Sequence, residues 1–182
     1  MNEQQIIAGC KEQKHEAQKM LYEKYARTMY GICLRYSSDE DAAKDLLQDG
    51  FIKVFANINS FLEKGSFEGW LKRIFINLAL ENIRRQKNII QSSENIQEIP
   101  DVVDSATEEN DMYKISESVL LKMVQELPKG YATVFNLYAI EDLAHKEIAE
   151  MLGITESTSR SQYVRARQIL QEKVRQYIKD SM

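Results

Sequence analysis

The chain has 182 residues, with 28 acidic and 24 basic side chains and a formal net charge of −4. Hydrophobic residues make up 43% of it and aromatic residues 9%, which is typical of a folded globular protein rather than a disordered or fibrous one. Only 7 glycines and 2 prolines occur, which argues against a sandwich, a barrel or a Rossmann sheet, because these folds need many turns. The sequence therefore predicts an all-α protein.

Several classes of function leave no trace in the sequence. No apolar run approaches the roughly 20 residues that span a bilayer, and the N-terminus lacks the basic-then-apolar pattern of a signal peptide. Cys10 and Cys33 form no C-x-x-C motif, so we expect two reduced thiols in a cytoplasmic protein. The histidines belong to no Cys/His cluster, and phosphate-binding and nucleophile motifs are missing. We therefore expect no metal, no cofactor, no small-molecule substrate and no enzymatic activity.

Apolar spacing predicts three helices in the first half of the chain. The first runs from about residue 17 to 36, and the second begins near Asp39, where Asp39 or Ser38 provides the cap. A break at Asn57–Gly65 separates this second helix from a third, which runs from Phe67 to about Arg85.

The third predicted helix is apolar on two opposite sides. One side carries Phe67, Trp70, Leu71, Ile74, Phe75 and Leu78, and the other carries Ile76, Leu80 and Ile83. We therefore expect it to be mostly buried, with Trp70 in the core first. Arg73, Asn77 and Arg84 share the narrow polar stripe that is left, and such a row on a buried helix indicates a nucleic-acid edge.

Local charge divides the chain. Leu71–Ile90 carries five basic side chains against one acidic, and Arg160–Arg175 has the same balance. Between them, Gln91–Asp111 has seven acidic side chains and no basic one, with little apolar periodicity. Such a segment buries too little apolar surface to offset its ordering entropy, so it reads as an acidic linker. We expect two small helical domains, residues 1–90 and 115–182.

The second half is predicted to open with two helices. Residues 119–127 carry one apolar helical face. Pro128 stands at the start of the next helix, which we expect to end near Ala139.

A helix-turn-helix is predicted next. A helix over His145–Leu152 is followed by Gly153, which permits a left-handed turn, and Thr155 can cap a second helix. The second helix has a basic outward face that can enter a major groove. That face carries Ser157, Arg160, Ser161 and Arg165. A plain αα-hairpin with a solvated basic face remains the alternative.

The segment GITESTSRSQYVRARQIL resembles the promoter-reading helix-turn-helix of extracytoplasmic-function (ECF) sigma factors, which often reads G-I-S-x-G-T-V-K-S-R-L-x-R-A-R. The matching positions are Gly153, Ile154, Thr158, Ser161, Arg165, Ala166 and Arg167. Two positions depart from the pattern, because Ser157 stands where Gly is common and Ser159 replaces an apolar residue. Upstream, ELPKGYATVFNLYAIEDL resembles the family's E-L-P-x-x-x-R-x-V-F-x-L, with Tyr131 or Ala132 near its usual Arg.

The first half resembles the polymerase-docking and −10-reading region of the same family. The segment DLLQDGFIKVFANINSFLEKGSFEGWLKRIFINLALENIRR contains D-x-x-Q-D/E-x-F, then S-F, then F-x-x-W-L-x-R-I-x-x-N. Together the two resemblances cover about residues 15–90 and 118–175.

The resemblance implies three sets of functional residues. A polar ridge beside the apolar stripe of the second helix would dock on core polymerase, and it consists of Asp45, Gln48, Asp49 and Lys53. The −35 element would be read by Ser157, Thr158, Arg160, Ser161, Val164, Arg165 and Arg167. Opening the −10 element without ATP requires a pocket for an unstacked base. The −10 set is Asn57, Asn59, Ser60, Phe61, Ser66, Phe67, Trp70, Arg73, Asn77 and Arg84, with Phe61 also expected to pack in the core.

The resemblance thus implies a transcription-initiation subunit that binds core RNA polymerase and promoter DNA, and that is held by an anti-sigma factor. It places the acidic linker, residues 91–114, in the RNA path of the polymerase. The net charge of −4 suits a factor that binds DNA strongly only once polymerase positions it. Two alternatives stay open: a stand-alone helix-turn-helix transcriptional regulator and a helical adaptor that binds only proteins.

Overall fold

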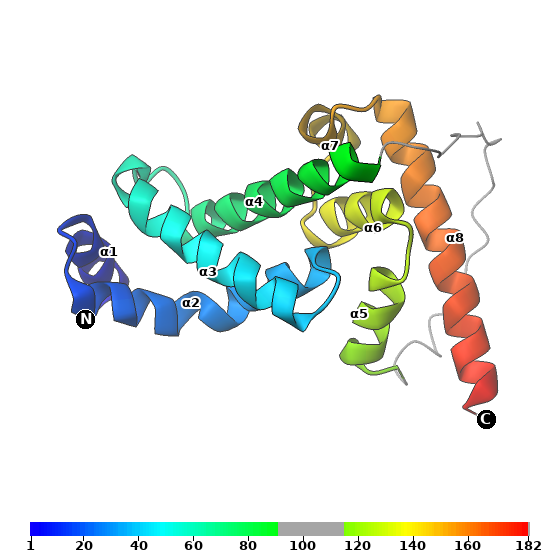
Figure 1. Cartoon of the computed structure of the whole chain (residues 1–182), viewed down its shortest axis with the longest axis horizontal. Helices are drawn as coiled ribbons and strands as arrows, with labels where there is room; N and C mark the ends of the chain where they lie inside the picture. Colours follow the sequence, from blue (N-terminus) through cyan, green and yellow to red (C-terminus); the bar gives the residue numbers. More distant parts are fainter. Residues whose placement is uncertain (91–114, 182) are drawn as a thin grey trace. The chain divides into compact units, whose positions relative to one another are not determined.

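A computed structural model describes residues 1–90 and 115–181 of the chain (Figure 1). These residues form helices and turns without a strand, so the predicted all-α class is confirmed. The chain divides into two compact units, Met1–Gln91 and Ser92–Met182. The predicted acidic linker, residues 91–114, lies outside the described residues.

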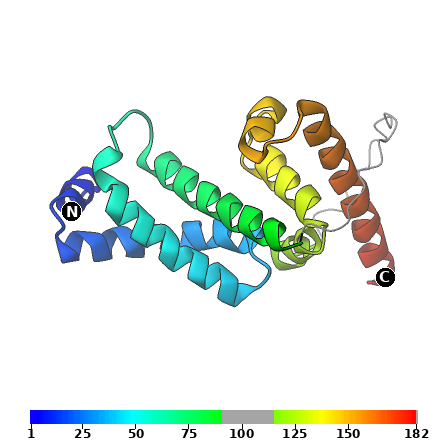
Figure 2. The ribbon, with the colours of Figure 1, turned by 45° about the horizontal axis from the view of Figure 1, so that its top comes forward.

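The first unit is built from helices α1 (Glu3–Lys11), α2 (His15–Tyr36), α3 (Glu40–Asn57) and α4 (Phe67–Ile90), and Figure 2 shows α2, α3 and α4 side by side. Each of these three helices contacts the other two, and α1 packs on α2. A 3-10 turn, Ile58–Ser60, follows α3.

Side-chain caps explain where two of these helices begin. Asn2 and Gln5 form a reciprocal capping box at the start of α1, a helix that the apolar spacing did not reveal. Of the two expected caps for α3, the structure uses Asp39, whose carboxylate accepts the backbone N–H of Ala42 at 2.8 Å. That hydrogen bond, with a second from Ser38, lowers the pKa of the Asp39 carboxyl.

Aromatic rings fill the core of the first unit. The rings of Phe51 on α3 and Phe75 on α4 meet edge to face, with centroids 5.4 Å apart. Gly50 lets α3 come this close, because a Cβ at Gly50 would lie only 2.1 Å from the Phe75 ring. Cys10 and Cys33 are buried as free thiols, and burial raises the pKa of Cys33 to about 12.

The second unit contains α5 (Glu117–Gln125), α6 (Lys129–Phe135), α7 (His145–Leu152) and α8 (Glu156–Asp180). Pro128 caps α6, as its position suggested. The helix expected to run to Ala139 instead changes after Phe135 into a π-helical turn, Asn136–Ile140. Helix α6 and helix α8 pack together around Val124, Leu127 and Ala166. No helix in the described ranges is long and apolar enough to cross a membrane.

Candidate nucleic-acid interface

Helix α3 presents a polar ridge opposite its buried stripe. Asp45, Gln48 and Asp49 are all exposed, whereas Leu46 and Leu47 between them are buried. This is the amphipathic arrangement that the spacing predicted. The ridge is therefore available for contact with another molecule while α3 is held rigidly by the core.

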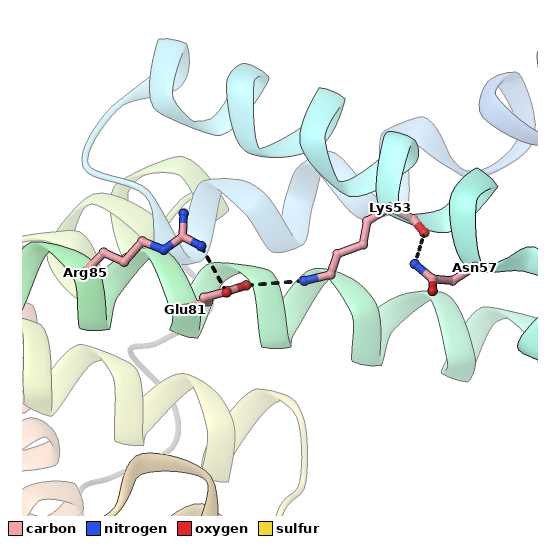
Figure 3. Close-up of polar contacts among 4 residues, drawn as sticks. All are labelled: Lys53, Asn57, Glu81 and Arg85. Carbon is pink, nitrogen blue, oxygen red and sulfur yellow. Dashed lines mark hydrogen bonds and ion pairs between the residues drawn. The ribbon is translucent and has the colours of Figure 1, made fainter.

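The fourth residue of the docking set, Lys53, is tied to α4. Its ammonium group donates to the Glu81 carboxylate at 3.2 Å, and Arg85 donates to the same carboxylate at 3.1 Å (Figure 3). These two cations lower the pKa of Glu81. One turn beyond Lys53, at the last residue of α3, the Asn57 side chain donates to the Lys53 carbonyl at 2.8 Å. Sequence reasoning missed Glu81, because pairing across two helices leaves no local pattern.

The loop between α3 and α4 exposes some of the predicted −10 residues and buries others. Asn59, Ser60 and Ser66 are exposed. Phe61 is only 5% exposed, so its ring is a core side chain in this structure. Farther along the loop the backbone turns sharply, with Gly65 at a φ of 99°, in the region that favours glycine.

Three predicted −10 residues form one aromatic cluster. Phe61 lies 5.0 Å from Phe67 and 5.5 Å from Trp70, centroid to centroid, and Phe67 stacks on Trp70 at 5.5 Å. Phe61 and Phe67 are buried, whereas Trp70 is half-buried. Trp70 is therefore the member of the cluster whose ring reaches the surface.

The polar stripe of α4 lies where the two-sided apolar pattern placed it. Arg73, Asn77 and Arg84 are exposed, while Phe75 and Ile76 on the same helix are buried. In the first unit, the exposed stripe and the half-buried Trp70 thus lie on α4, and the predicted loop residues lie in the loop that leads into this helix. Exposed Arg and Asn beside an aromatic ring are chemically suited to phosphate and base contacts.

In the second unit, α7 and α8 form the predicted helix-turn-helix. Gly153 ends α7 in the left-handed region at a φ of 67°, and the Thr155 hydroxyl accepts the Thr158 backbone N–H at 3.0 Å to start α8. Small Ala149 is buried on α7, which lets the two helices approach closely.

The predicted −35 residues divide by exposure. Ser157, Arg160 and Val164 are exposed along α8, and Arg160 is ion-paired with Glu156 one turn earlier. Thr158, Ser161, Arg165 and Arg167 are half-buried.

Three of the half-buried side chains have polar atoms that are hydrogen-bonded within α8 and its cap or shielded from solvent. The Thr158 hydroxyl is hydrogen-bonded to Thr155 at 2.8 Å, and the Ser161 hydroxyl donates to the Thr158 carbonyl at 3.0 Å. The Nε atom of Arg165 is shielded from solvent without a hydrogen bond among the described residues.

Ser159, where the family pattern has an apolar residue, is fully buried at 0% exposure. Its hydroxyl forms a 2.9 Å hydrogen bond with Nδ1 of His145 on α7, which satisfies both polar groups. The His145 ring also stacks on Tyr138, with centroids 4.2 Å apart. Burial, and then the charge of Arg160, lowers the pKa of His145, although Glu156 opposes this. Sequence reasoning missed this pair, since its members lie on different helices.

Both units match known family models. The model for Sigma-70 region 2 matches residues 21–89 of the first unit, and the model for Sigma-70, region 4 matches residues 118–170 of the second. Across the described residues 1–90 and 115–181, the structure holds no group of three or more His, Cys, Asp or Glu that could bind a metal ion. The two family matches, one in each unit, therefore define a protein of the sigma-70 class.

Comparison with curated relatives narrows this class, and the chain belongs to the ECF sigma factors. It is 28% identical over 182 residues to an ECF RNA polymerase sigma-E factor of Haemophilus influenzae, covering 96% of each chain. It is 29% identical over 159 residues to the ECF RNA polymerase sigma factor SigW of Bacillus subtilis, covering 83% of this chain and 85% of the relative. The resemblance found in the sequence is confirmed.

The fold is also found in two solved structures. The sigma factor RpoE of Bartonella quintana, solved in complex with the anti-sigma factor NepR, aligns with a TM-score of 0.54 at 23% identity, covering 85% of this chain and 94% of that one. CnrH, solved in complex with the cytosolic domain of CnrY, aligns with a TM-score of 0.51 at 18% identity, covering 93% of this chain and 94% of that one.

Proposed function

We propose that the two units divide promoter recognition between them, the first binding core RNA polymerase and opening the −10 element and the second reading the −35 element. Membership of the ECF sigma factors makes the chain a factor for promoter-specific transcription initiation, and the comparisons do not favour the stand-alone regulator. The observation that carries this division is the placement of exposed polar side chains on rigid helices in both units.

Polymerase binding is assigned to the ridge of Asp45, Gln48 and Asp49, with Lys53 at its end. The ridge is exposed, and the opposite face of α3 is fixed in the core by Phe51. A rigid acidic surface suits docking on a basic partner, because little side-chain and backbone freedom is lost on binding.

The −35 element is read by α8 as duplex DNA. Arg160 is placed to contact guanine or phosphate, and Val164 offers an apolar surface to a thymine methyl group. Arg165 and Arg167 lie farther along α8 and add phosphate contacts, with Ser157, Thr158 and Ser161 near the start of the helix.

The −10 element is opened by the first unit. Arg73, Asn77 and Arg84 hold the strand by its phosphates and base edges, and Trp70 offers its half-buried ring for stacking. The loop residues Asn57, Asn59, Ser60 and Ser66 give polar groups around an unstacked base, beside the rings of Phe61 and Phe67.

The chain acts without catalysing a reaction of its own, in the cytoplasm, as a subunit of the polymerase holoenzyme. We also propose that an anti-sigma factor controls it. This rests on the two structural neighbours, which were solved in complex with the anti-sigma factor NepR and the cytosolic domain of CnrY. The acidic segment of residues 91–114 is proposed to occupy the RNA path, because its seven acidic side chains mimic the charge of a nucleic acid.

Gel filtration with bacterial core RNA polymerase tests this function. The wild-type chain is expected to co-elute with core polymerase stoichiometrically, and Asp45→Arg to lose most of this co-elution, because it reverses one of the two acidic charges of the ridge. Glu23→Arg is the matched control, since Glu23 is an exposed acid on α2 whose recorded ion pair is with Lys19. Failure of the wild-type chain to bind polymerase would refute the function, and normal binding by Asp45→Arg would refute the docking surface.

A further inference from the structure

Helix α1 precedes residues 21–89, which the region 2 model matches, yet it is firmly packed on α2. Its own side chains Ile6 and Cys10 are buried. Gly9 comes so close to α2 that a Cβ there would lie 2.6 Å from the Ala17 Cβ. The capping box fixes its first turn. Helix α1 is therefore a rigid platform packed on the core of the first unit rather than a loose extension.

The C-terminal end of this platform reaches the loop between α3 and α4. Helix α1 contacts the 3-10 turn that follows α3 (Figure 2). From its last residue, the Lys11 ammonium group donates to the Phe61 carbonyl at 3.2 Å, in a partly buried contact. The Glu63 carboxylate lies 3.9 Å from the same ammonium group. A hydrogen bond from a charged donor is stronger than one between neutral groups, so it can fix the loop backbone at Phe61.

The N-terminal end of α1 is linked to the same aromatic cluster through the side chain of Tyr25. The Glu3 carboxylate accepts hydrogen bonds from the Lys24 ammonium group and from the Tyr25 hydroxyl. The Tyr25 ring lies 5.8 Å from Phe67, which in turn contacts Phe61. The two ends of α1 thus hold the two buried rings of the cluster, Phe61 by its backbone and Phe67 by its ring contact.

We propose that Lys11 is a positioning residue for the −10 site, an inference that rests on the proposed function of the loop. Lys11 holds the backbone of Phe61, and therefore the wall of the base pocket, in one place. A recognition site must be held within about 0.5 Å to keep its selectivity, so a loop released at this point loses discrimination before the fold is lost. The rings of Phe61 and Phe67 also pack edge to face on each other, with centroids 5.0 Å apart, so their burial has a contact that does not involve Lys11.

The test uses the full chain assembled with bacterial core RNA polymerase, on a promoter selected from a randomised duplex library by the wild-type holoenzyme. Lys11→Met removes the hydrogen bond, Lys11→Arg keeps a charged donor, and Lys14→Met is the control. Lys14 has the same charge three residues away, but its ammonium group pairs with Glu12 at 2.6 Å. Three readouts are measured: co-elution with core polymerase, permanganate-detected opening, and the fluorescence of 2-aminopurine placed at each −10 adenine.

Lys11→Met is expected to bind core polymerase normally and to open the promoter roughly tenfold less, as loss of one charge-assisted hydrogen bond predicts. We also expect a weaker 2-aminopurine signal at the captured position and a flatter preference among the four bases there. Lys11→Arg is expected to restore both, and Lys14→Met to behave as the wild type.

Wild-type opening and base preference in Lys11→Met would overturn the proposal. So would equal loss of core binding and opening without rescue by Lys11→Arg, since this would make α1 merely structural. A wild-type holoenzyme that forms but never opens promoters would overturn the proposed function itself.

Discussion

The close approach of α3 and α4 at Gly50 predicts a strong effect of Gly50→Ala on the first unit. The added Cβ would lie 2.1, 2.5 and 2.6 Å from three atoms of the Phe75 ring. That ring is fully buried and is backed by Phe51 at 5.4 Å, so it has little room to retreat. Overpacking of this kind costs about 1–3 kcal/mol, and the clash involves a rigid ring, which favours the upper end. Alanine in a helix recovers about 0.5–1 kcal/mol, which leaves a net loss of about 2 kcal/mol.

The assay is denaturant and thermal unfolding of the full chain, followed by the fluorescence of Trp70. Trp70 is the sole tryptophan of the chain, so its signal reports the first unit alone. A loss of about 2 kcal/mol lowers the melting temperature of a domain of this size by about 8–16 °C.

Gly31→Ala is the matched control, because Gly31 lies inside α2 and a Cβ there meets nothing within 4 Å. It is expected to gain about 0.5–1 kcal/mol, since the helix-propensity benefit comes without a clash. Equal stability of Gly50→Ala and the wild type would refute the packing argument, because the helices would then separate at no cost.

Three further outcomes are expected. Arg165→Ala should weaken −35-dependent initiation to a similar extent for every −35 sequence, because the residue is assigned to phosphates, and should spare core binding; unchanged promoter output would contradict its role. Arg73→Ala combined with Asn77→Ala should impair permanganate-detected opening, and full opening would leave that stripe a solvated surface only. Because burial lowers the pKa of His145 below 6.5, protonation favours the unfolded state, so the stability that neutral His145 contributes to the second unit should be complete above about pH 6.5 and be lost as the pH falls through the lowered pKa. Hydrogen exchange in α7 and α8, measured as a function of pH, would detect this loss of stability. The pH dependence should vanish in His145→Gln but persist in His15→Gln.

Much of the fold could be predicted because the helices of this chain are amphipathic and long. The apolar period located α2, α3 and α4, and Gly153 with Thr155 located the turn between α7 and α8. Helix α1 was not predicted, because it has only 9 residues and an apolar period of 3.6 barely repeats over that length. The π-helical turn after Phe135 was not predicted either, because residues 136–140 continue an apolar helical pattern and only the hydrogen-bond register changes.

The candidate site was predictable in residue type but not in pairing. Exposure of Asp45, Asn77 and Arg160 follows from helical spacing, which a sequence records directly. The contacts of Glu81 with Lys53, and of His145 with Ser159, join residues on different helices. Their distances depend on how the helices cross, so one sequence without relatives gives no sign of them.

The mixture of exposed and buried residues on α8 has a consequence for how new promoter preferences arise. Ser157 and Val164 project into solvent, so they can change to almost any side chain while the second unit stays folded. Ser159 and Ala166 are fully buried on the same helix and tolerate almost no change. Selection can therefore vary the exposed side of α8, which we propose reads the −35 element, independently of its packing side. A family of orthogonal factors, each addressing its own promoters, is reachable by substitutions on one exposed strip.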